Sequence, residues 1–127
     1  MTTEGWLRPD WPAPAGVRAA VSTCEVPGAS AEPFARFNLG SRCGDAPAAV
    51  AANRAALETM LGLPAPPRWL RQVHGIAVAE SGGDGAEPEA DAAVTRTSGE
   101  PLAILTADCL PVLFCAADGS EVAAAHA

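Results

Sequence analysis

Two histidines and one cysteine are the residues of this sequence best suited to chemistry. His74 lies in the segment RQVHG, Cys109 lies in LTADCLPVLFC, and His126 is the penultimate residue. Imidazole nitrogen and thiolate sulfur are zinc ligands, and three such ligands leave one tetrahedral position for water or substrate. The separations, 35 residues from 74 to 109 and 17 from 109 to 126, are unlike those of a compact zinc finger.

The same residues allow two further interpretations. The histidines could be hydrogen-bonded core residues and Cys109 a buried thiol, because free cysteine is among the most buried residue types. Alternatively, Cys109 could be a nucleophile paired with His74, as in a thiol hydrolase or amidase. The residue types alone do not decide between them. Of the remaining cysteines, Cys115 is interpreted as a buried thiol, and Cys24 and Cys43 as structural or incidental.

An aspartate and a proline interrupt the apolar run around Cys109. Burying an unpaired carboxylate costs several kcal/mol, and a proline removes a ladder donor, so a central strand should end or bend there. Asp108 either orders the turn before Pro111 through its own hydrogen bonds or orients a metal-bound histidine or a substrate donor.

The segment FNLGSRCGD is a second candidate site. Gly40 and Gly44 permit backbone turns that side chains would block, and Asn38, Arg42 and Asp45 place polar groups beside them. Backbone N–H groups here and at the start of the following helix could hold an anion such as phosphate. An ordinary capped turn is the alternative. The Gly-Lys-Ser/Thr ending of a Walker loop is absent.

A single helix is expected next to this loop, in DAPAAVAANRAALETMLGL. Asp45 is the predicted N-cap and Gly62 the C-terminal stop. Val50, Leu57 and Leu61 recur at helical spacing and predict one apolar face.

Strands are expected in most of the remaining chain, which makes the fold class α+β. A structured loop is predicted over residues 27–47, and residues 1–16 are predicted to be an irregular lead-in. The turn ADGS should join the last two strands as a hairpin. The predicted strands are 17–26, 69–73, a run from Ile76, the segment ADAAVTRT, 102–106, 112–116 and 122–126.

Composition excludes several classes of protein. The net charge of -7, the scattered basic residues and the low aromatic content argue against nucleic-acid binding. No apolar run reaches the length of a membrane span. Because no signal peptide is recognisable, we expect a cytoplasmic protein with reduced thiols.

Several segments, in their order, resemble the laccase-domain family, whose members are also called multicopper polyphenol oxidoreductases or purine nucleoside phosphorylases. They are FNLGSRCGD, VAANRAAL, WLRQVHG, ADAAVT, TADCLPVLFC and EVAAAHA. The resemblance implies that residues 17–127 are the N-terminal half of a domain. The fold it implies has mixed β-sheets flanked by helices, a layered α/β/β/α type that is incomplete in this chain.

The resemblance also implies a function. It assigns a zinc site, catalytic as well as metal-binding, to His74, Cys109 and His126, with Asp108 and Pro111 shaping the strand end that presents Cys109. The implied reaction is phosphorolysis of adenosine, inosine, guanosine and methylthioadenosine, with purine nucleoside and phosphate as partners and adenosine deamination in several members. Zinc is favoured over copper because three scattered ligands do not make the several copper centres of a laccase. Substrate-binding candidates in the matching segments are Asn38, Arg42, Gln72 and Asp108.

Two features depart from the family pattern. Arg42 stands where many members have histidine. Members also continue after the His-Ala pair with Gly-Trp-Arg-Gly, whereas this sequence stops there, so we expect weak or absent activity from the 127-residue chain. A polyphenol oxidase and an inactive binding fragment are competing hypotheses for its function.

Overall fold

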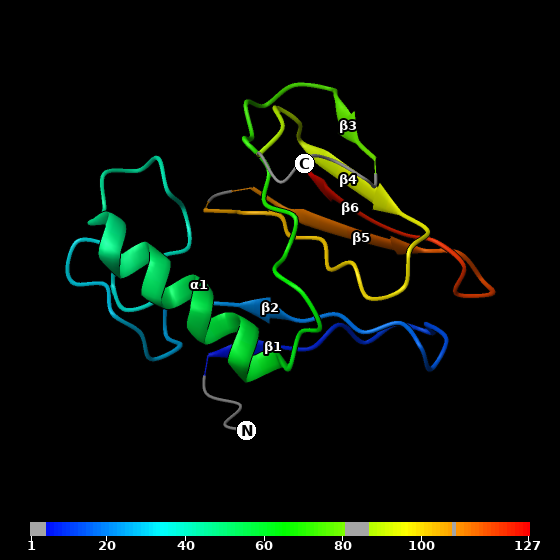
Figure 1. The fold of residues 1–127 in the computed structure, drawn as a ribbon, viewed down its shortest axis with the longest axis horizontal. Helices are drawn as coiled ribbons and strands as arrows, with labels where there is room; N and C mark the ends of the chain where they lie inside the picture. Colours follow the sequence, from blue (N-terminus) through cyan, green and yellow to red (C-terminus); the bar gives the residue numbers. More distant parts are fainter. Residues whose placement is uncertain (1–4, 81–86, 108) are drawn as a thin grey trace. The chain divides into compact units, whose positions relative to one another are not determined.

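The chain folds into two compact units. The computed structural model describes residues 5–80, 87–107 and 109–127. The first unit comprises Met1–Pro12 and Arg18–Gly62, and the second comprises Ala13–Val17 and Leu63–Ala127. Their helices and strands are labelled in Figure 1. Each unit has its own set of hydrogen bonds, and each presents a different group of the candidate residues.

Two very short strands open the first unit. β1 (Trp6–Leu7) pairs antiparallel with β2 (Val21–Ser22), so the predicted lead-in contains a strand. The strand predicted over 17–26 is reduced to two residues. It ends because the N–H of Val26 donates to the carbonyl of Thr23 at 3.2 Å, which closes a turn.

The predicted helix is present as α1 (Pro47–Leu61). Proline suits its first turn because the missing N–H has no partner there anyway, and Gly62 ends it in the left-handed conformation with φ 62°. The predicted N-cap is wrong. Ala46 occupies that position without a side-chain cap, while Asp45 accepts a hydrogen bond from the hydroxyl of Ser30 at 2.7 Å.

One face of α1 is buried, largely as its apolar spacing predicts. Val50 and Leu57 are buried, whereas Leu61 is only half-buried. Asn53, which lies on the same face, is also buried. Its amide group accepts from the N–H of Ala29 and donates to the hydroxyl of Ser30 and the carbonyl of Asn38. These bonds fasten the long predicted loop to the helix.

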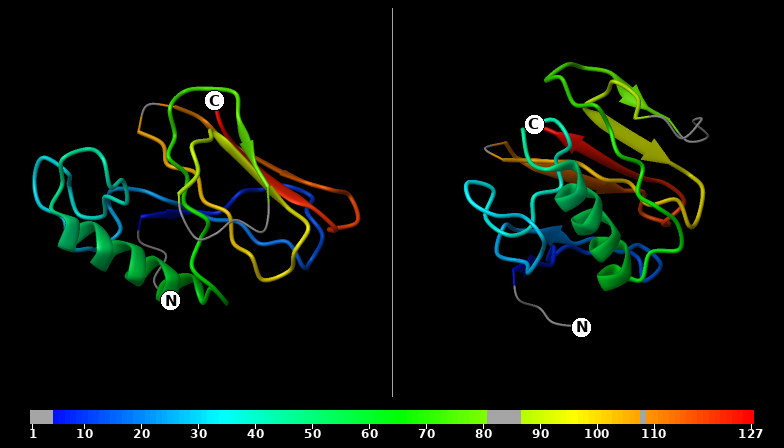
Figure 2. Two further views of the ribbon diagram at one scale, coloured as in Figure 1. Left: turned by 45° about the horizontal axis from the view of Figure 1, so that its top comes forward. Right: turned by 60° about the vertical axis from the view of Figure 1, so that its left-hand side comes forward.

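The second unit contains a four-stranded mixed sheet in the order β3-β4-β6-β5 (Figure 1). β3 (Val78–Ala79), all that forms of the strand predicted from Ile76, runs parallel to β4 (Ala92–Thr95). β6 (Val122–His126) pairs antiparallel with β4 and with β5 (Pro111–Cys115). Figure 2 shows β4, β6 and β5 side by side in two further views. The α+β class and the mixed sheet are thus confirmed.

The β5–β6 hairpin follows the prediction closely. β6 has the predicted bounds, and the ADGS turn is closed by a 2.9 Å hydrogen bond from the N–H of Gly119 to the carbonyl of Ala116. β5 begins one residue before the predicted start. Pro111 is its first residue, a position at which a strand tolerates the missing N–H.

Two predicted strands are absent. Residues 69–73 and 102–106 form no strand. Arg71 and Leu102 take part only in isolated bridges, with Glu89 and Arg68 respectively. The side chain of Gln72 instead bonds to the backbone of Leu105, donating to its carbonyl and accepting from its N–H, both at 2.7 Å. An amide side chain therefore replaces the strand pairing that the apolar pattern predicted.

The core of the second unit is built mostly from small side chains. Leu70, Ala90 and Ala93 are buried together, with Ala79, Leu102 and Ile104 packed against them. Asp91, between the two buried alanines, is buried with them. Within the described residues, no helix combines the length and apolarity needed to cross a membrane.

Candidate metal centre

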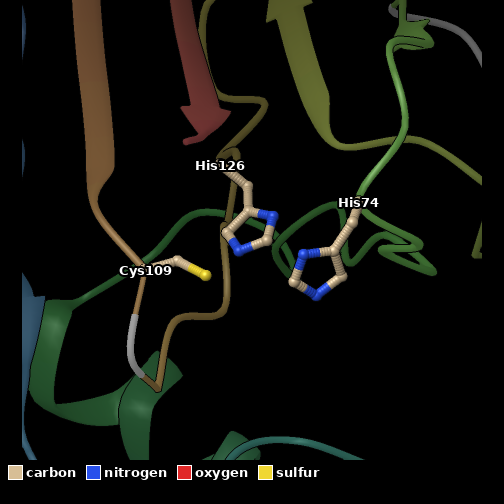
Figure 3. A group of neighbouring side chains, drawn as sticks. All are labelled: His74, Cys109 and His126. Carbon is tan, nitrogen blue, oxygen red and sulfur yellow. The ribbon is translucent and has the colours of Figure 1, made fainter.

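His74, Cys109 and His126 come together in the second unit. Their potential ligand atoms all lie within 4.8 Å of one another, and Figure 3 shows the three side chains converging from separate segments. The rings of His74 and His126 meet edge to face, with centroids 4.8 Å apart. His74 is exposed and Cys109 is half-buried, whereas the side chain of His126 is buried. The cluster is therefore open to solvent on the side of His74.

The β5–β6 hairpin brings Cys109 and His126 together. Pro111 lies opposite His126 in the register of the two strands. Beyond this pair, Leu110 and Ala127 exchange two backbone hydrogen bonds of 2.9 Å. Cys109 directly precedes this paired stretch. Antiparallel pairing thus converts a long sequence separation into close contact.

Asp91 connects the two histidines. It directly precedes β4 and is 3 % exposed. One carboxylate oxygen accepts from the N–H groups of Val73 at 3.0 Å and Gly75 at 2.9 Å. The other accepts from the N–H of His74 at 2.9 Å and lies 3.0 Å from Nδ1 of His126. One buried side chain therefore contacts both elements that carry the histidines.

The hydrogen bonds around Asp91 keep it ionised. Burial by itself raises the pKa of a carboxyl group, but the N–H groups of Gly75 and Val73, the ring of His126 and the N–H of His74 outweigh it. Together they hold the pKa of Asp91 well below its ordinary value. At neutral pH the group is a negative charge beside the imidazole ring of His126 and the backbone of His74.

The backbone at His74 is unusual. Its φ of 62° lies in the left-handed region, which residues other than glycine adopt uncommonly. Such a conformation persists only where the surroundings hold it in place. The three consecutive N–H groups that Asp91 accepts, from residues 73 to 75, provide that restraint.

The donor set fits a metal ion. Zinc lies about 2.0–2.3 Å from nitrogen and sulfur ligands, so tetrahedral ligand atoms are roughly 3.3–3.8 Å apart. Donor atoms within 4.8 Å of one another reach that spacing by small side-chain rotations. Two imidazoles and a thiolate also leave a fourth position open, as catalytic zinc sites do.

Gln72 and Asp108 are the substrate contacts predicted near this cluster. The amide of Gln72 is engaged on both sides by the backbone of Leu105, and it thereby fixes the segment leading to His74. Asp108 lies outside the described residues.

Asn38 and Arg42, predicted as further substrate contacts, belong to the first unit. Asn38 forms hydrogen bonds in both directions with Gly40 and donates to the carboxylate of Asp45 at 3.2 Å. Asp45 in turn accepts from the N–H of Ala46 at 2.8 Å. The side chains of Asn38 and Asp45 are thus hydrogen-bonded within the loop itself. Arg42 is exposed.

Sequence reasoning misses Asp91. The segment ADAAVT predicts only a strand by its pattern, although a lone carboxylate at the start of a buried strand must find donors. The argument that the sequence pattern gives for a carboxylate at Asp108 holds equally for Asp91. The pattern predicts a satisfied carboxylate but not which N–H groups satisfy it.

The chain is similar to known proteins over most of its length. A family profile described as "Multi-copper polyphenol oxidoreductase laccase" matches residues 19–127. The chain belongs to this family. The chain is similar to a purine nucleoside phosphorylase of Xylella fastidiosa strain Temecula1. The two are 51 % identical over 127 residues, covering 93 % of this chain and 49 % of that protein. Purine nucleoside phosphorylase YfiH of Escherichia coli K12 is 49 % identical over 94 % of this chain and 49 % of its own length.

Solved structures show the same fold. Protein NMB0706 of Neisseria meningitidis matches with a TM-score of 0.90 and 42 % identity, over 98 % of this chain and 50 % of that chain. YlmD of Geobacillus stearothermophilus matches with a TM-score of 0.86 and 35 % identity, over 100 % of this chain and 51 % of that chain. The chain thus spans about half the length of the relatives it matches.

Proposed function

We propose that this chain provides the zinc-binding half of a purine nucleoside phosphorylase. The observation that carries the proposal is the convergence of both histidines of the sequence with Cys109. The names of relatives that are about half identical to the chain support the reaction class. A cytoplasmic location, where the thiol of Cys109 stays reduced, belongs to the same proposal.

In this proposal His74, Cys109 and His126 hold zinc. Bound zinc supplies a Lewis acid. Copper is disfavoured because one set of three ligands does not provide the several centres that oxidase chemistry requires. The buried carboxylate of Asp91 balances the charge of the site and keeps the two histidine-bearing segments in place.

The proposed substrates are phosphate and the nucleosides adenosine, inosine, guanosine and methylthioadenosine, with adenosine deamination as a second reaction. In phosphorolysis, a phosphate oxygen bonds to the ribose carbon as the bond to the purine breaks, and the purine leaves with its electron pair. The exposed guanidinium of Arg42 has the charge to attract phosphate. The other proposed substrate contacts are Asn38, Gln72 and Asp108. The hydrogen bonds of Asn38 and Gln72 hold their own segments in place.

Metal content is the first test. We expect near-stoichiometric zinc in the untagged chain purified without added metal, measured by plasma mass spectrometry, and its loss in Cys109→Ala. Cys115→Ala is the matched control, because Cys115 is a half-buried thiol on the adjoining strand outside the cluster. Equal zinc in both variants, or copper in its place, would contradict the assignment.

Turnover is the second test. A chimera joining this chain to the remaining half of the Xylella relative should release purine base from inosine only when phosphate is present. His74→Ala in the chimera should abolish that release. Base release that persists in His74→Ala would overturn the proposed role of the cluster.

A thiol hydrolase is a second candidate because Asp91, His126 and Cys109 follow one another in space. The carboxylate contacts Nδ1 of His126, and the sulfur of Cys109 lies in the same cluster. A base oriented by a third group is the arrangement that activates a nucleophile. This function predicts inactivation by thiol alkylation and indifference to chelators, whereas the zinc enzyme loses its activity to chelators.

A further inference from the structure

We propose that Asp91 is the positioning residue of the cluster: it fixes which nitrogen of His126 faces the metal position and holds the backbone that presents His74. The inference rests on the proposed function only for the identity of the ligand that the cluster binds. The role of Asp91 in the metal-free chain follows from its contacts alone.

The contact with His126 determines the form of that imidazole. Nδ1 lies 3.0 Å from a carboxylate oxygen, and the two side chains are 7 % and 4 % exposed, so water has little access to the pair. An ionised carboxylate only accepts hydrogen bonds, so Nδ1 must carry the proton. In the neutral ring the lone pair then lies on Nε2, the nitrogen left for the cluster. Carboxylates orient metal-binding histidines in this way.

The contacts with the His74 segment determine where the second imidazole lies. Val73, His74 and Gly75 direct three consecutive N–H groups at the same carboxylate, at 2.9–3.0 Å. Without that acceptor, nothing in these contacts would hold His74 at a φ of 62°. A single side chain therefore aligns one histidine through its ring and the other through its backbone.

The variant Asp91→Asn tests whether Asp91 acts through its hydrogen bonds or only through the volume that its side chain occupies. The amide has nearly the shape of the carboxylate but has one accepting oxygen and one donating NH2 group. If the oxygen serves Val73 and Gly75, the NH2 group faces His74 N–H and Nδ1 of His126. It then donates to Nδ1, and the ring must move its proton to Nε2. The nitrogen needed by the metal loses its lone pair.

The experiment is a measurement of imidazole tautomers by long-range proton–nitrogen NMR correlation. It uses the untagged, metal-free chain at about pH 8. The sequence contains two histidines, so the spectrum of His74→Gln identifies the signals of His126. Asp118→Asn is the matched control, because Asp118 is exposed and accepts hydrogen bonds from Ser120 in the hairpin turn, away from the cluster.

We expect His126 to be protonated on Nδ1 in the wild type and in Asp118→Asn, and on Nε2 in Asp91→Asn. Zinc titration of the same samples should show an affinity about 10- to 100-fold lower in Asp91→Asn, while Asp118→Asn should match the wild type.

Three outcomes distinguish the positioning role proposed for Asp91 from the proposed zinc enzyme. A wild-type His126 protonated on Nε2 overturns the role of Asp91, even if Asp91→Asn fails to fold. So does a folded Asp91→Asn that keeps both the wild-type tautomer and the wild-type zinc affinity. A wild type that binds no zinc but shows the expected change of tautomer supports the role of Asp91 and counts against the zinc enzyme.

Discussion

Each unit of this protein uses one buried polar side chain to hold irregular backbone. In the first unit Asn53 ties the long loop to α1, accepting from Ala29 and donating to Ser30 and Asn38. In the second unit Asp91 collects the N–H groups of residues 73 to 75 and the ring of His126. The two arrangements solve the same problem, because buried polar backbone requires partners.

The difference lies in what the partners carry. Asn53 is neutral and both donates and accepts, and its partners are backbone groups and a hydroxyl. Asp91 is charged and only accepts, and two of its partners belong to candidate metal ligands. A buried amide with all its hydrogen bonds made indicates a structural role, whereas a buried charge between two histidines indicates a functional site.

The largest effect on stability is expected from removing the carboxylate of Asp91 altogether. Asp91→Ala leaves three backbone N–H groups and a buried imidazole without their acceptor. We expect the free energy of unfolding to fall by about 3–5 kcal/mol, as when one partner of a buried charged pair is removed. Urea denaturation of Asp91→Ala beside Asp118→Ala measures this. Equal stability of the two variants would show that Asp91 is not a structural centre.

A somewhat smaller effect is expected from Asn53→Ala, which removes the bonds to Ala29, Ser30 and Asn38. Because unsatisfied buried groups cost about 1–3 kcal/mol, we expect a loss of about 2–3 kcal/mol and unchanged zinc affinity. Thr59→Ala is the control on the same helix, since its hydroxyl only bonds back to the carbonyl of Ala55. A loss of zinc affinity in Asn53→Ala would contradict the conclusion that Asn53 has a structural role and Asp91 a role at the metal site.

Gln72→Glu should have a moderate effect. Glutamate can still accept from the N–H of Leu105 but cannot donate to its carbonyl. We expect a loss of about 1–2 kcal/mol in thermal or urea unfolding. In the chimera, an unchanged KM for inosine would show that Gln72 only fastens the two segments and is not the proposed substrate contact. A raised KM with unchanged stability would instead make Gln72 a substrate contact.

The smallest effect on the free energy of unfolding is expected from Asp45, and this effect depends on pH. The hydrogen bond from Ser30 is the largest influence on the pKa of Asp45 and lowers it from its ordinary value. Desolvation opposes this, and the bonds from Asn38 and Ala46 lower the pKa further. A depressed pKa means that the folded state favours the ionised form, so this stabilisation is present above the unfolded-state pKa. It is lost as the pH falls through the folded-state pKa.

Asp45→Asn tests this by urea unfolding at neutral and at acidic pH. The variant should be slightly less stable than the wild type near neutral pH, and the difference should vanish in acid. A difference that grows on acidification would contradict the sign of this argument.

Elements with a strong local pattern could be predicted from the sequence. The helix is predicted by the spacing of Val50 and Leu57 and by Gly62, which adopts the left-handed conformation of a helix end. The last strand and its turn are predicted by alternation and by the ADGS segment. In each case neighbouring residues determine the structure, so no distant contact is needed to recognise it.

The failed predictions depend on distant partners. The segments 69–73 and 102–106 have apolar strand patterns, but Gln72 supplies the bonds that strand pairing would have made. Asp45 has the residue type of an N-cap but bonds to Ser30, 15 residues away. The grouping of His74, Cys109 and His126 is implied by family resemblance. Residue spacing could not give it, because the hairpin register and Asp91 bring these residues together.

The hairpin also determines how far apart two members of the cluster, Cys109 and His126, lie. Its turn lies at one end of the two strands, and the pairs of Pro111 with His126 and Leu110 with Ala127 lie at the other. Because side chains alternate between faces, a shift of one residue in the pairing would move His126 to the opposite face of the sheet. The number of residues in the ADGS turn therefore sets the distance between sulfur and imidazole. A single inserted residue there would act on the cluster while touching none of its atoms.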